Sequence, residues 1–152
     1  DFELDYITEA QTDYQRLMRK NSKKLYNHKA SAHSEVALQK LAMIPPEKGK
    51  EYLPEEMWGK QKFNTTWGRL VWDTVSPTID TRFDTPSNGT NSHPELNRAI
   101  TPREAARIQS FDDNFVFYGS KFYIRSQIGN AVPPLMAEAI ANEIWENYYE
   151  QE

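Results

Sequence analysis

Residues 101–104, Thr-Pro-Arg-Glu, are typical of the start of a helix, and no other segment of the chain restricts the local fold as much. Thr101 can cap the helix with its hydroxyl group. Pro102 suits the first helical position because no backbone donor is needed there, and Glu104 can close a capping box. The sequence therefore predicts a helix from Pro102 to about Ser110.

Proline also opens the last predicted helix, because Pro133 and Pro134 follow a Gly-Asn turn at 129–130. Large apolar side chains then recur at intervals of four residues, which is typical of one stripe along a helix: Met136, Ile140, Ile144 and Tyr148. A helix with such a stripe needs a partner surface. We therefore expect it to be hidden, either by folding back onto the chain or, preferably, by self-association through this helix.

Two further helices are predicted upstream. The first spans about 8–20 and begins with Thr8 and Gln11, which have the spacing of a capping box. The second begins near Ser34 and ends at Ile44, because the proline that follows disfavours helical backbone in the residue before it.

Short strands are predicted at 69–72 and 78–81, where β-branched and aromatic residues cluster. The stretches 45–66, 83–95 and 115–123 contain turn residues or show no sustained period, so they are predicted to be irregular. The predicted fold class is therefore α+β, a small irregular domain with short strands flanked by helices.

The composition is that of a globular chain, with 38% hydrophobic and 26% charged residues among 152. The sequence has no membrane-spanning run and no signal peptide, so an intracellular location without membrane association is expected. It contains no cysteine, which excludes disulfides and cysteine-based zinc sites, and no metal site is expected. Because the chain does not begin with methionine, we expect it to be cut from a longer one.

Charge is unevenly distributed, although the net charge is −4. Basic side chains without any acid lie between Arg16 and Lys29, and acids without any base follow Arg125. This uneven distribution of charge indicates a basic face turned toward phosphates, with a solvated charged loop as the alternative.

Arg103 and Arg107 share one face of the predicted helix. Two arginines at this spacing either bind carboxylates and carbonyls of the protein or contact phosphate. The segment 127–134 is either a structural turn or, because a helix N-terminus favours anions, part of an anion site.

Residues 98–111, Arg-Ala-Ile-Thr-Pro-Arg-Glu-Ala-Ala-Arg-Ile-Gln-Ser-Phe, and 127–134, Gln-Ile-Gly-Asn-Ala-Val-Pro-Pro, together resemble the last two motifs of the cytosine-5 DNA methyltransferases. In that family the first motif continues with Phe-Pro-Asp, where this chain has Phe-Asp-Asp at 111–113, a change that loosens a turn. Further similarities to the target-recognition region of the family lie at 26–28, 44–46, 67–73, 76–81 and 93–95.

The resemblance implies a C-terminal fragment. It divides the chain into a target-recognition region over 1–97, a connecting helix and aromatic loop over 98–126, and a turn and helix over 127–152 that complete a Rossmann-like cofactor domain. In the family a cysteine thiolate adds to C6 of a cytosine rotated out of the duplex, and C5 then takes the methyl group of S-adenosylmethionine. Since the chain has no cysteine, the fragment is expected to have no catalytic residue, to be inactive alone and to need the N-terminal catalytic domain as its partner.

The resemblance also implies roles for individual residues. Three residues of the turn are expected beside the methionine part of S-adenosylmethionine: Asn130, Ala131 and Val132. Three arginines are expected to hydrogen-bond within the protein and to organise its core: Arg98, Arg103 and Arg107.

Contacts with double-stranded DNA are expected from two regions. Phosphate contacts are predicted in the basic segment, from Lys20, Lys23 and Lys24. A loop over 82–91, whose short polar side chains can reach base edges, is predicted to contribute Arg82, Thr85, Ser87, Asn88 and Asn91, with an ordinary polar turn as the alternative. Two other functions stay open, a standalone DNA-binding module without catalysis and a cytosine-5 methyltransferase acting on tRNA.

Overall fold

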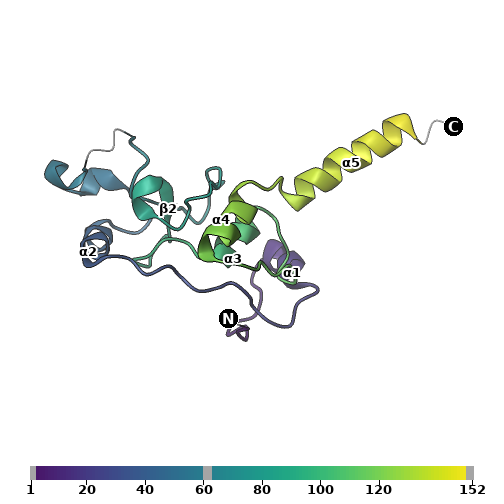
Figure 1. Ribbon diagram of the computed structural model, residues 1–152, viewed down its shortest axis with the longest axis horizontal. Helices are drawn as coiled ribbons and strands as arrows, with labels where there is room; N and C mark the ends of the chain where they lie inside the picture. The colour runs from purple at the N-terminus through teal and green to yellow at the C-terminus, as the bar shows by residue number, and fades with distance from the viewer. Residues whose placement is uncertain (1–2, 60–62, 150–152) are drawn as a thin grey trace.

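The computed structural model describes residues 3–59 and 63–149 (Figure 1). Within these residues, helices and short strands are joined by long irregular segments: α1 Asp13–Arg19, α2 Glu35–Met43, β1 Gly68–Arg69, β2 Thr90–Ser92, α3 Pro102–Ile108, α4 Lys121–Gly129 and α5 Pro134–Tyr148. Single 3-10 turns lie at Lys50–Tyr52, Glu55–Met57 and Pro86–Asn88. The fold is α+β, as the sequence predicts.

The two strands of the described residues form a small parallel sheet. Gly68 of β1 lies opposite Thr90 of β2, Arg69 lies opposite Ser92, and the register shifts between these pairs. Glycine permits the close approach, because a Cβ atom at position 68 would lie 2.6 Å from Thr90 Oγ1. The predicted strand at 69–72 is therefore mostly wrong, since β1 begins one residue earlier and ends at Arg69.

The prediction of a strand at 78–81 is also wrong, because this segment has no strand partner. It packs against the end of α4, where Ile79 is buried and the backbone of Asp80 approaches Gly129. By contrast, β2 lies within the stretch 83–95 that was predicted to be a loop. Its residues Asn91 and Ser92 are polar and have low strand propensity, yet both are buried beside β1.

Helices α2 and α3 begin where the sequence predicts. The Ser34 hydroxyl accepts a hydrogen bond from the Ala37 N–H group at 3.3 Å. At α3 the capping box is complete, since Thr101 Oγ1 accepts from the Glu104 N–H group at 3.2 Å and the Glu104 carboxylate accepts from the Thr101 N–H group at 2.7 Å. Local hydrogen bonds alone account for both starts.

Helix α1 begins later than predicted, because Thr12 and not Thr8 is its cap. Both threonines stand three residues before a glutamine, so the sequence pattern fits either position. The predicted irregular stretch 115–123 is wrong in its last part, where Ser120 caps α4 and the helix continues to Gly129. Helix α5 begins at Pro134, which confirms the prediction.

Two hydrophobic clusters form the core of the described residues. The larger one joins α3 and α4 to the segments around them and consists of Leu70, Ile79, Phe83, Ile100, Ala105, Ala106, Phe117 and Ile128. The smaller one packs α2 against neighbouring segments and consists of Leu41, Ile44, Leu53 and Trp67. Figure 1 shows α3 and α4 in the middle of the molecule, α2 and α1 on either side, and α5 extending away from this body.

Candidate functional site

Arg98 and Glu104 fix the segment that enters α3. The two terminal nitrogens of Arg98 each donate to the Glu104 carboxylate at 2.7 Å. Burial raises the pKa of Glu104, but the hydrogen bond and the charge of Arg98 outweigh burial and hold this pKa below its usual value. The result is an ionised, bidentate pair of the kind that gives strong and directional hydrogen bonds.

Arg103 is fully buried in the middle of the body. Its guanidinium group donates to the carbonyl oxygens of Tyr26 at 2.9 Å, Asp112 at 2.9 Å and Phe115 at 2.6 Å. Asp112 stands where the family pattern has proline, and it contributes its carbonyl oxygen, which proline also has. Arg103 thus joins three segments of the chain and presents no donor at the surface for a phosphate group.

Asp113 binds Arg107 and Tyr6 through a buried carboxylate. Arg107 Nε donates to Asp113 Oδ1 at 2.8 Å, and the Tyr6 hydroxyl donates to Oδ2 at 2.6 Å. Burial raises the pKa of Asp113, but hydrogen bonds from Arg107 and Tyr6 outweigh burial and hold this pKa below its usual value. These contacts anchor the N-terminal segment to α3.

Arg69 is a second buried guanidinium group, which the sequence analysis missed. It is 3% exposed and donates five hydrogen bonds, to the carbonyl oxygens of Leu41, Ile44, His93 and Leu96 and to Asn97 Oδ1. Leu41 and Ile44 lie at the C-terminal end of α2, where carbonyl groups lack helical partners. Arg69 therefore ties α2 and β1 to the segment that precedes α3.

The link between α4 and α5 contains the residues predicted to bind the cofactor. Asn130 caps the end of α4 and is exposed, Ala131 is partly buried, and Val132 is 60% exposed. The side-chain amide of Asn130 makes no hydrogen bond with the described residues, so it has donors and acceptors open to a ligand. Two of the three residues therefore face solvent, and their side chains are open to a ligand or to another part of the protein.

The loop predicted to contact base edges is partly occupied by internal contacts. Two of its residues donate to nearby carboxylates, Asn88 to Asp80 at 2.8 Å and Thr85 to Asp84 at 3.3 Å. The Ser87 hydroxyl makes no hydrogen bond with the described residues, and Arg82 is exposed. Ser87 and Arg82 are therefore the two members of the loop whose side chains make no contact with a nearby carboxylate of the described residues, whereas Asn91 is buried in β2.

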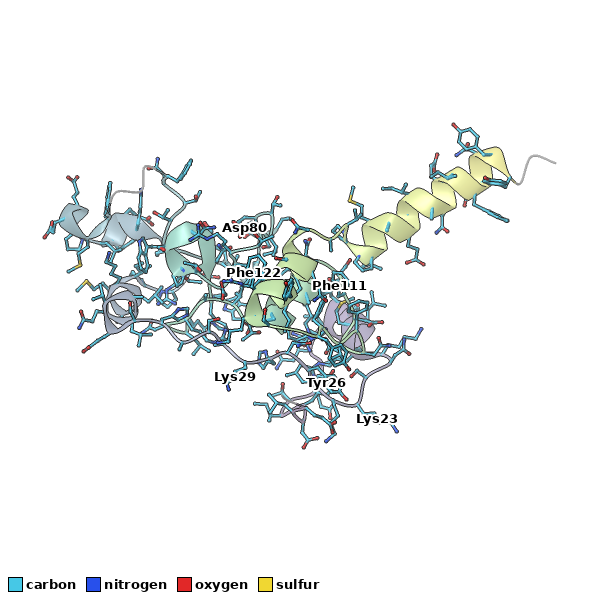
Figure 2. The ribbon with its side chains drawn as sticks, viewed as in Figure 1. Lys23, Tyr26, Lys29, Asp80, Phe111 and Phe122 are labelled. Atoms are coloured by element: carbon cyan, nitrogen blue, oxygen red, sulfur yellow. The ribbon has the colours of Figure 1, made fainter. Side chains whose placement is uncertain are left out.

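The predicted phosphate contacts lie on a different part of the surface. Figure 2 shows Lys23 at the lower edge of the body and Asp80, the partner of Asn88, in its upper middle. Lys24 Nζ lies 2.8 Å from Asp5 and 3.3 Å from Glu3. The hydrogen bond with Asp5 is the main reason why the pKa of Lys24 is raised. Of these two lysines, Lys23 has no carboxylate partner among the described residues.

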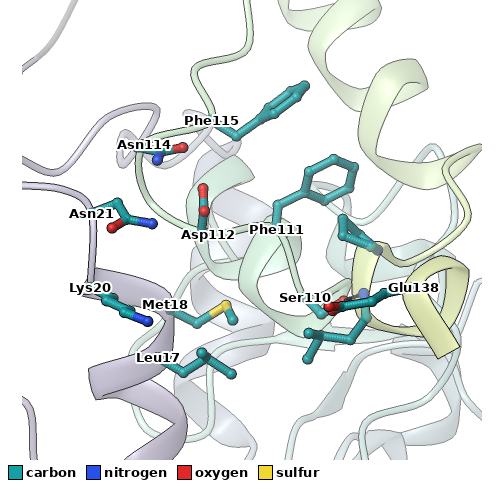
Figure 3. A pocket seen from close by; sticks show the side chains of 12 residues that line it. Leu17, Met18, Lys20, Asn21, Ser110, Phe111, Asp112, Asn114, Phe115 and Glu138 are labelled. Carbon is teal, nitrogen blue, oxygen red and sulfur yellow. Dashed lines mark hydrogen bonds between the residues drawn. The ribbon is translucent and has the colours of Figure 1, made fainter. Parts of the chain in front are cut away.

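Lys20 lines a cavity of about 520 Å³ between α1, the segment that follows α3 and the start of α5 (Figure 3). The other charged residues of its lining are Asp112 and Glu138, so acids outnumber bases there. In Figure 3, Phe111 and Phe115 form an apolar side of the same cavity. This charge balance disfavours a phosphate group inside the cavity.

The apolar stripe of α5 is exposed along its whole length. The exposed fractions are 57% for Met136, 48% for Ile140, 48% for Ile144 and 78% for Tyr148. The start of the helix is tied to the body by the Leu135 N–H group, which donates to Ser110 Oγ at 3.1 Å. Because α5 extends away from the body (Figure 1), the predicted fold-back is not observed.

Two of the histidines make structural contacts. His28 Nδ1 lies 3.0 Å from the Thr101 hydroxyl, and His93 Nδ1 accepts from the Glu95 and Leu96 N–H groups. Among residues 3–59 and 63–149, no cluster of three or more potential ligands could hold a metal ion. Over the same residues, no helix is both long enough and apolar enough to span a bilayer.

The chain is similar to DNA methyltransferases along almost its whole length. The family described as C-5 cytosine-specific DNA methylase matches residues 2–146, and the chain belongs to this family. The type II methyltransferase M1.HphI of Haemophilus parahaemolyticus is 32% identical over 148 residues, which cover 93% of this chain and 37% of that protein. For M.DdeI of Desulfomicrobium norvegicum the identity is 34% over 158 residues, with coverage of 92% and 37%.

A solved structure has the same fold. It is described as a DNA modification methyltransferase encoded within a prophage of E. coli, and it matches with a TM-score of 0.61 at 21% identity, over 96% of this chain and 41% of that one. The chain spans 37% of the length of M1.HphI and 37% of the length of M.DdeI. Members of the family use S-adenosylmethionine as methyl donor.

Proposed function

We propose that this chain is the C-terminal part of a DNA (cytosine-5-)-methyltransferase, which transfers a methyl group from S-adenosylmethionine to C5 of cytosine in a specific DNA sequence. The observation that carries the proposal is the family match over residues 2–146, together with relatives that are type II methyltransferases. The chain has no cysteine, so the nucleophile of the reaction belongs to the rest of the enzyme. This part contributes target recognition and one side of the cofactor site.

The division of labour follows the chain. We assign 1–97 to target recognition, 98–126 to the connection and 127–152 to the cofactor domain. Helix α4 crosses the second boundary as one continuous element, Lys121–Gly129, which supports a rigid connection between these two parts. The Gln109 side chain supports it further, because its N–H group donates to the Ile128 carbonyl oxygen at 3.0 Å across this boundary. Arg103 joins the connection to the recognition part through the Tyr26 carbonyl oxygen.

Asn130, Ala131 and Val132 would hold the amino-acid end of S-adenosylmethionine. The open amide of Asn130 offers donors for a carboxylate and an acceptor for an amino group, so it fits this end of the molecule. The cofactor supplies the methyl group when it is bound. The contribution of this chain is to orient that end from the exposed link between α4 and α5.

DNA contacts would come from two surfaces. Lys20, Lys23 and Lys24 are the proposed phosphate contacts, and Lys23 ranks first because acids surround the other two. Arg82, Thr85, Ser87 and Asn88 form the proposed recognition loop. Since Lys23 and Asp80, the partner of Asn88, lie well apart in Figure 2, one duplex contacts both Lys23 and Asn88 only if it runs across the body between them.

The exposed stripe of α5 would pack on the missing N-terminal catalytic domain. Burial of one such side chain stabilises a complex by about 1.5–3 kcal/mol, so several together provide a strong driving force. Without that domain, pairing of two α5 helices is the simplest way to cover the stripe. Self-association of the isolated chain is therefore part of the proposal.

The proposal is tested by the substrate preference of the full-length protein. Duplex DNA and tRNA would be offered in parallel with labelled S-adenosylmethionine, and the labelled base would be identified after hydrolysis. We expect 5-methylcytosine in the duplex and none in the tRNA. Label in tRNA alone would favour the tRNA enzyme, and DNA binding without label in either substrate would favour the standalone binding module.

A further inference from the structure

A cavity of about 430 Å³ lies between the segment that precedes α2 and the loop that precedes β2. Three separate parts of the chain contribute polar residues to its lining, among them His33, Ser87 and Lys121. Asp84 also lines it, but its carboxylate accepts a hydrogen bond from Arg125 at 2.6 Å. The negative charge of Asp84 is therefore matched by Arg125, and the charge left over in the cavity is that of Lys121.

His33 is held in the tautomer that leaves a hydrogen-bond donor on Nδ1. The Ala99 N–H group donates to His33 Nε2 at 3.0 Å, so this nitrogen carries a lone pair. Burial lowers the pKa of His33, so the ring is neutral at neutral pH and its proton is on Nδ1. Nδ1 makes no hydrogen bond with the described residues and has its proton available.

Ser87 and Lys121 add further open donors. Neither side chain makes a hydrogen bond or an ion pair with the described residues. Together with His33, they give the cavity three separate donors and one uncompensated positive charge. The complementary ligand has several acceptor atoms close together and carries negative charge.

We propose that this cavity binds a phosphate group of the DNA backbone, held by Lys121, His33 and Ser87. A phosphate group has the required charge and several acceptor oxygens. A base edge fits less well, because it is uncharged and because adenine and cytosine would turn an amino donor toward these donors. The inference rests on the proposed function, and it gives Ser87 a role in affinity in place of base reading.

The test is DNA binding by the full-length protein, measured by fluorescence anisotropy over a range of salt concentrations. One duplex carries the sequence that the enzyme methylates and the other an unrelated sequence. We expect Lys121→Met to weaken binding to both duplexes by about five- to tenfold and to lower the slope of log K against log salt by about one. Ser87→Ala should weaken binding to both duplexes by the same factor.

Lys48→Met is the matched control, because it also removes an exposed lysine charge but lies outside the cavity lining. It should leave both affinities close to those of the wild type. A series of duplexes with single uncharged methylphosphonate linkages locates the contact. At the linkage that contacts Lys121, replacing the charged phosphate should lower the affinity of the wild type. The same replacement should not lower the affinity of Lys121→Met any further, because that variant has already lost the contact.

Two results would overturn the phosphate site while leaving the proposed function in place. One is an unchanged affinity of Lys121→Met for both duplexes. The other is a loss confined to the methylated sequence, which would make the cavity a reader of bases. If the wild type binds neither duplex and transfers no methyl group, the proposed function itself fails and the phosphate site falls with it.

Discussion

Replacement of Arg103 by methionine is expected to destabilise the chain strongly. The change keeps an unbranched side chain but removes the donors to the Tyr26, Asp112 and Phe115 carbonyl groups. A buried acceptor left without a partner costs about 1–3 kcal/mol, and neighbouring losses do not add fully. The Tyr26 and Phe115 carbonyl oxygens lose the Arg103 donor, whereas that of Asp112 still accepts from the Phe115 N–H group at 3.3 Å. Asp113 keeps its ion pair with Arg107, so the carbonyl groups decide the magnitude. We expect the free energy of unfolding to fall by about 3–5 kcal/mol, a large share of the roughly 5–15 kcal/mol typical of a domain.

The measurement is urea unfolding of the chain, followed by circular dichroism. Arg82→Met is the matched control, because Arg82 is exposed and its loss should change the free energy of unfolding by no more than about 0.5 kcal/mol. An Arg103→Met variant within about 1 kcal/mol of the wild type would refute the reasoning that the buried guanidinium group holds three segments together.

Three further predictions concern ionisation, the cofactor and the last helix. Because the pKa of Asp113 is lowered in the folded chain, its ion pair stabilises the fold above the unfolded pKa of about 4 and is lost as the pH falls through the folded value. The urea midpoint should therefore fall more steeply with acid in the wild type than in Asp113→Asn, and parallel profiles would contradict this. In the full-length protein, Asn130→Ala should weaken S-adenosylmethionine binding by about 1.5–3 kcal/mol in calorimetry, and an unchanged Kd would remove Asn130 from the site. In sedimentation, Ile140→Asp should shift the isolated chain toward monomer while Asn142→Asp does not, and a wild type that stays monomeric at every concentration would exclude the paired helices.

The helices with local start signals are the ones that the sequence predicts well. Ser34, Thr101 and Pro134 act within one turn of their own helices, so no distant contact is needed to place α2, α3 or α5. The strands depend on pairing between segments about twenty residues apart, and β2 is built from polar residues. Strand propensity therefore could not predict β2.

The candidate site depends even more on distant contacts. The sequence leaves open whether Arg103 binds the protein or a phosphate group, and only its burial among three carbonyl groups decides this. Arg69 gives no signal beyond one basic residue in an apolar segment. Lys24 has no acidic neighbour in the sequence, and only the fold brings Asp5 beside it.

Gly129 is a motif residue whose structural role differs from the one that the sequence predicts. The pair 129–130 predicts a turn, but Gly129 ends α4, and a Cβ atom there would lie 2.5 Å from the Asp80 carbonyl carbon. Glycine is needed for close packing of two backbones. This need cannot be found without knowing that 78–81 lies against α4.

Methyl transfer to duplex DNA, compared between the isolated chain and the full-length protein, tests the central claim most directly. Both would be incubated with labelled S-adenosylmethionine and the same DNA under identical conditions. We predict 5-methylcytosine from the full-length protein and none from the chain alone, because the chain has no cysteine nucleophile. Label incorporated by the pure chain above background would contradict its assignment as the recognition part of the enzyme.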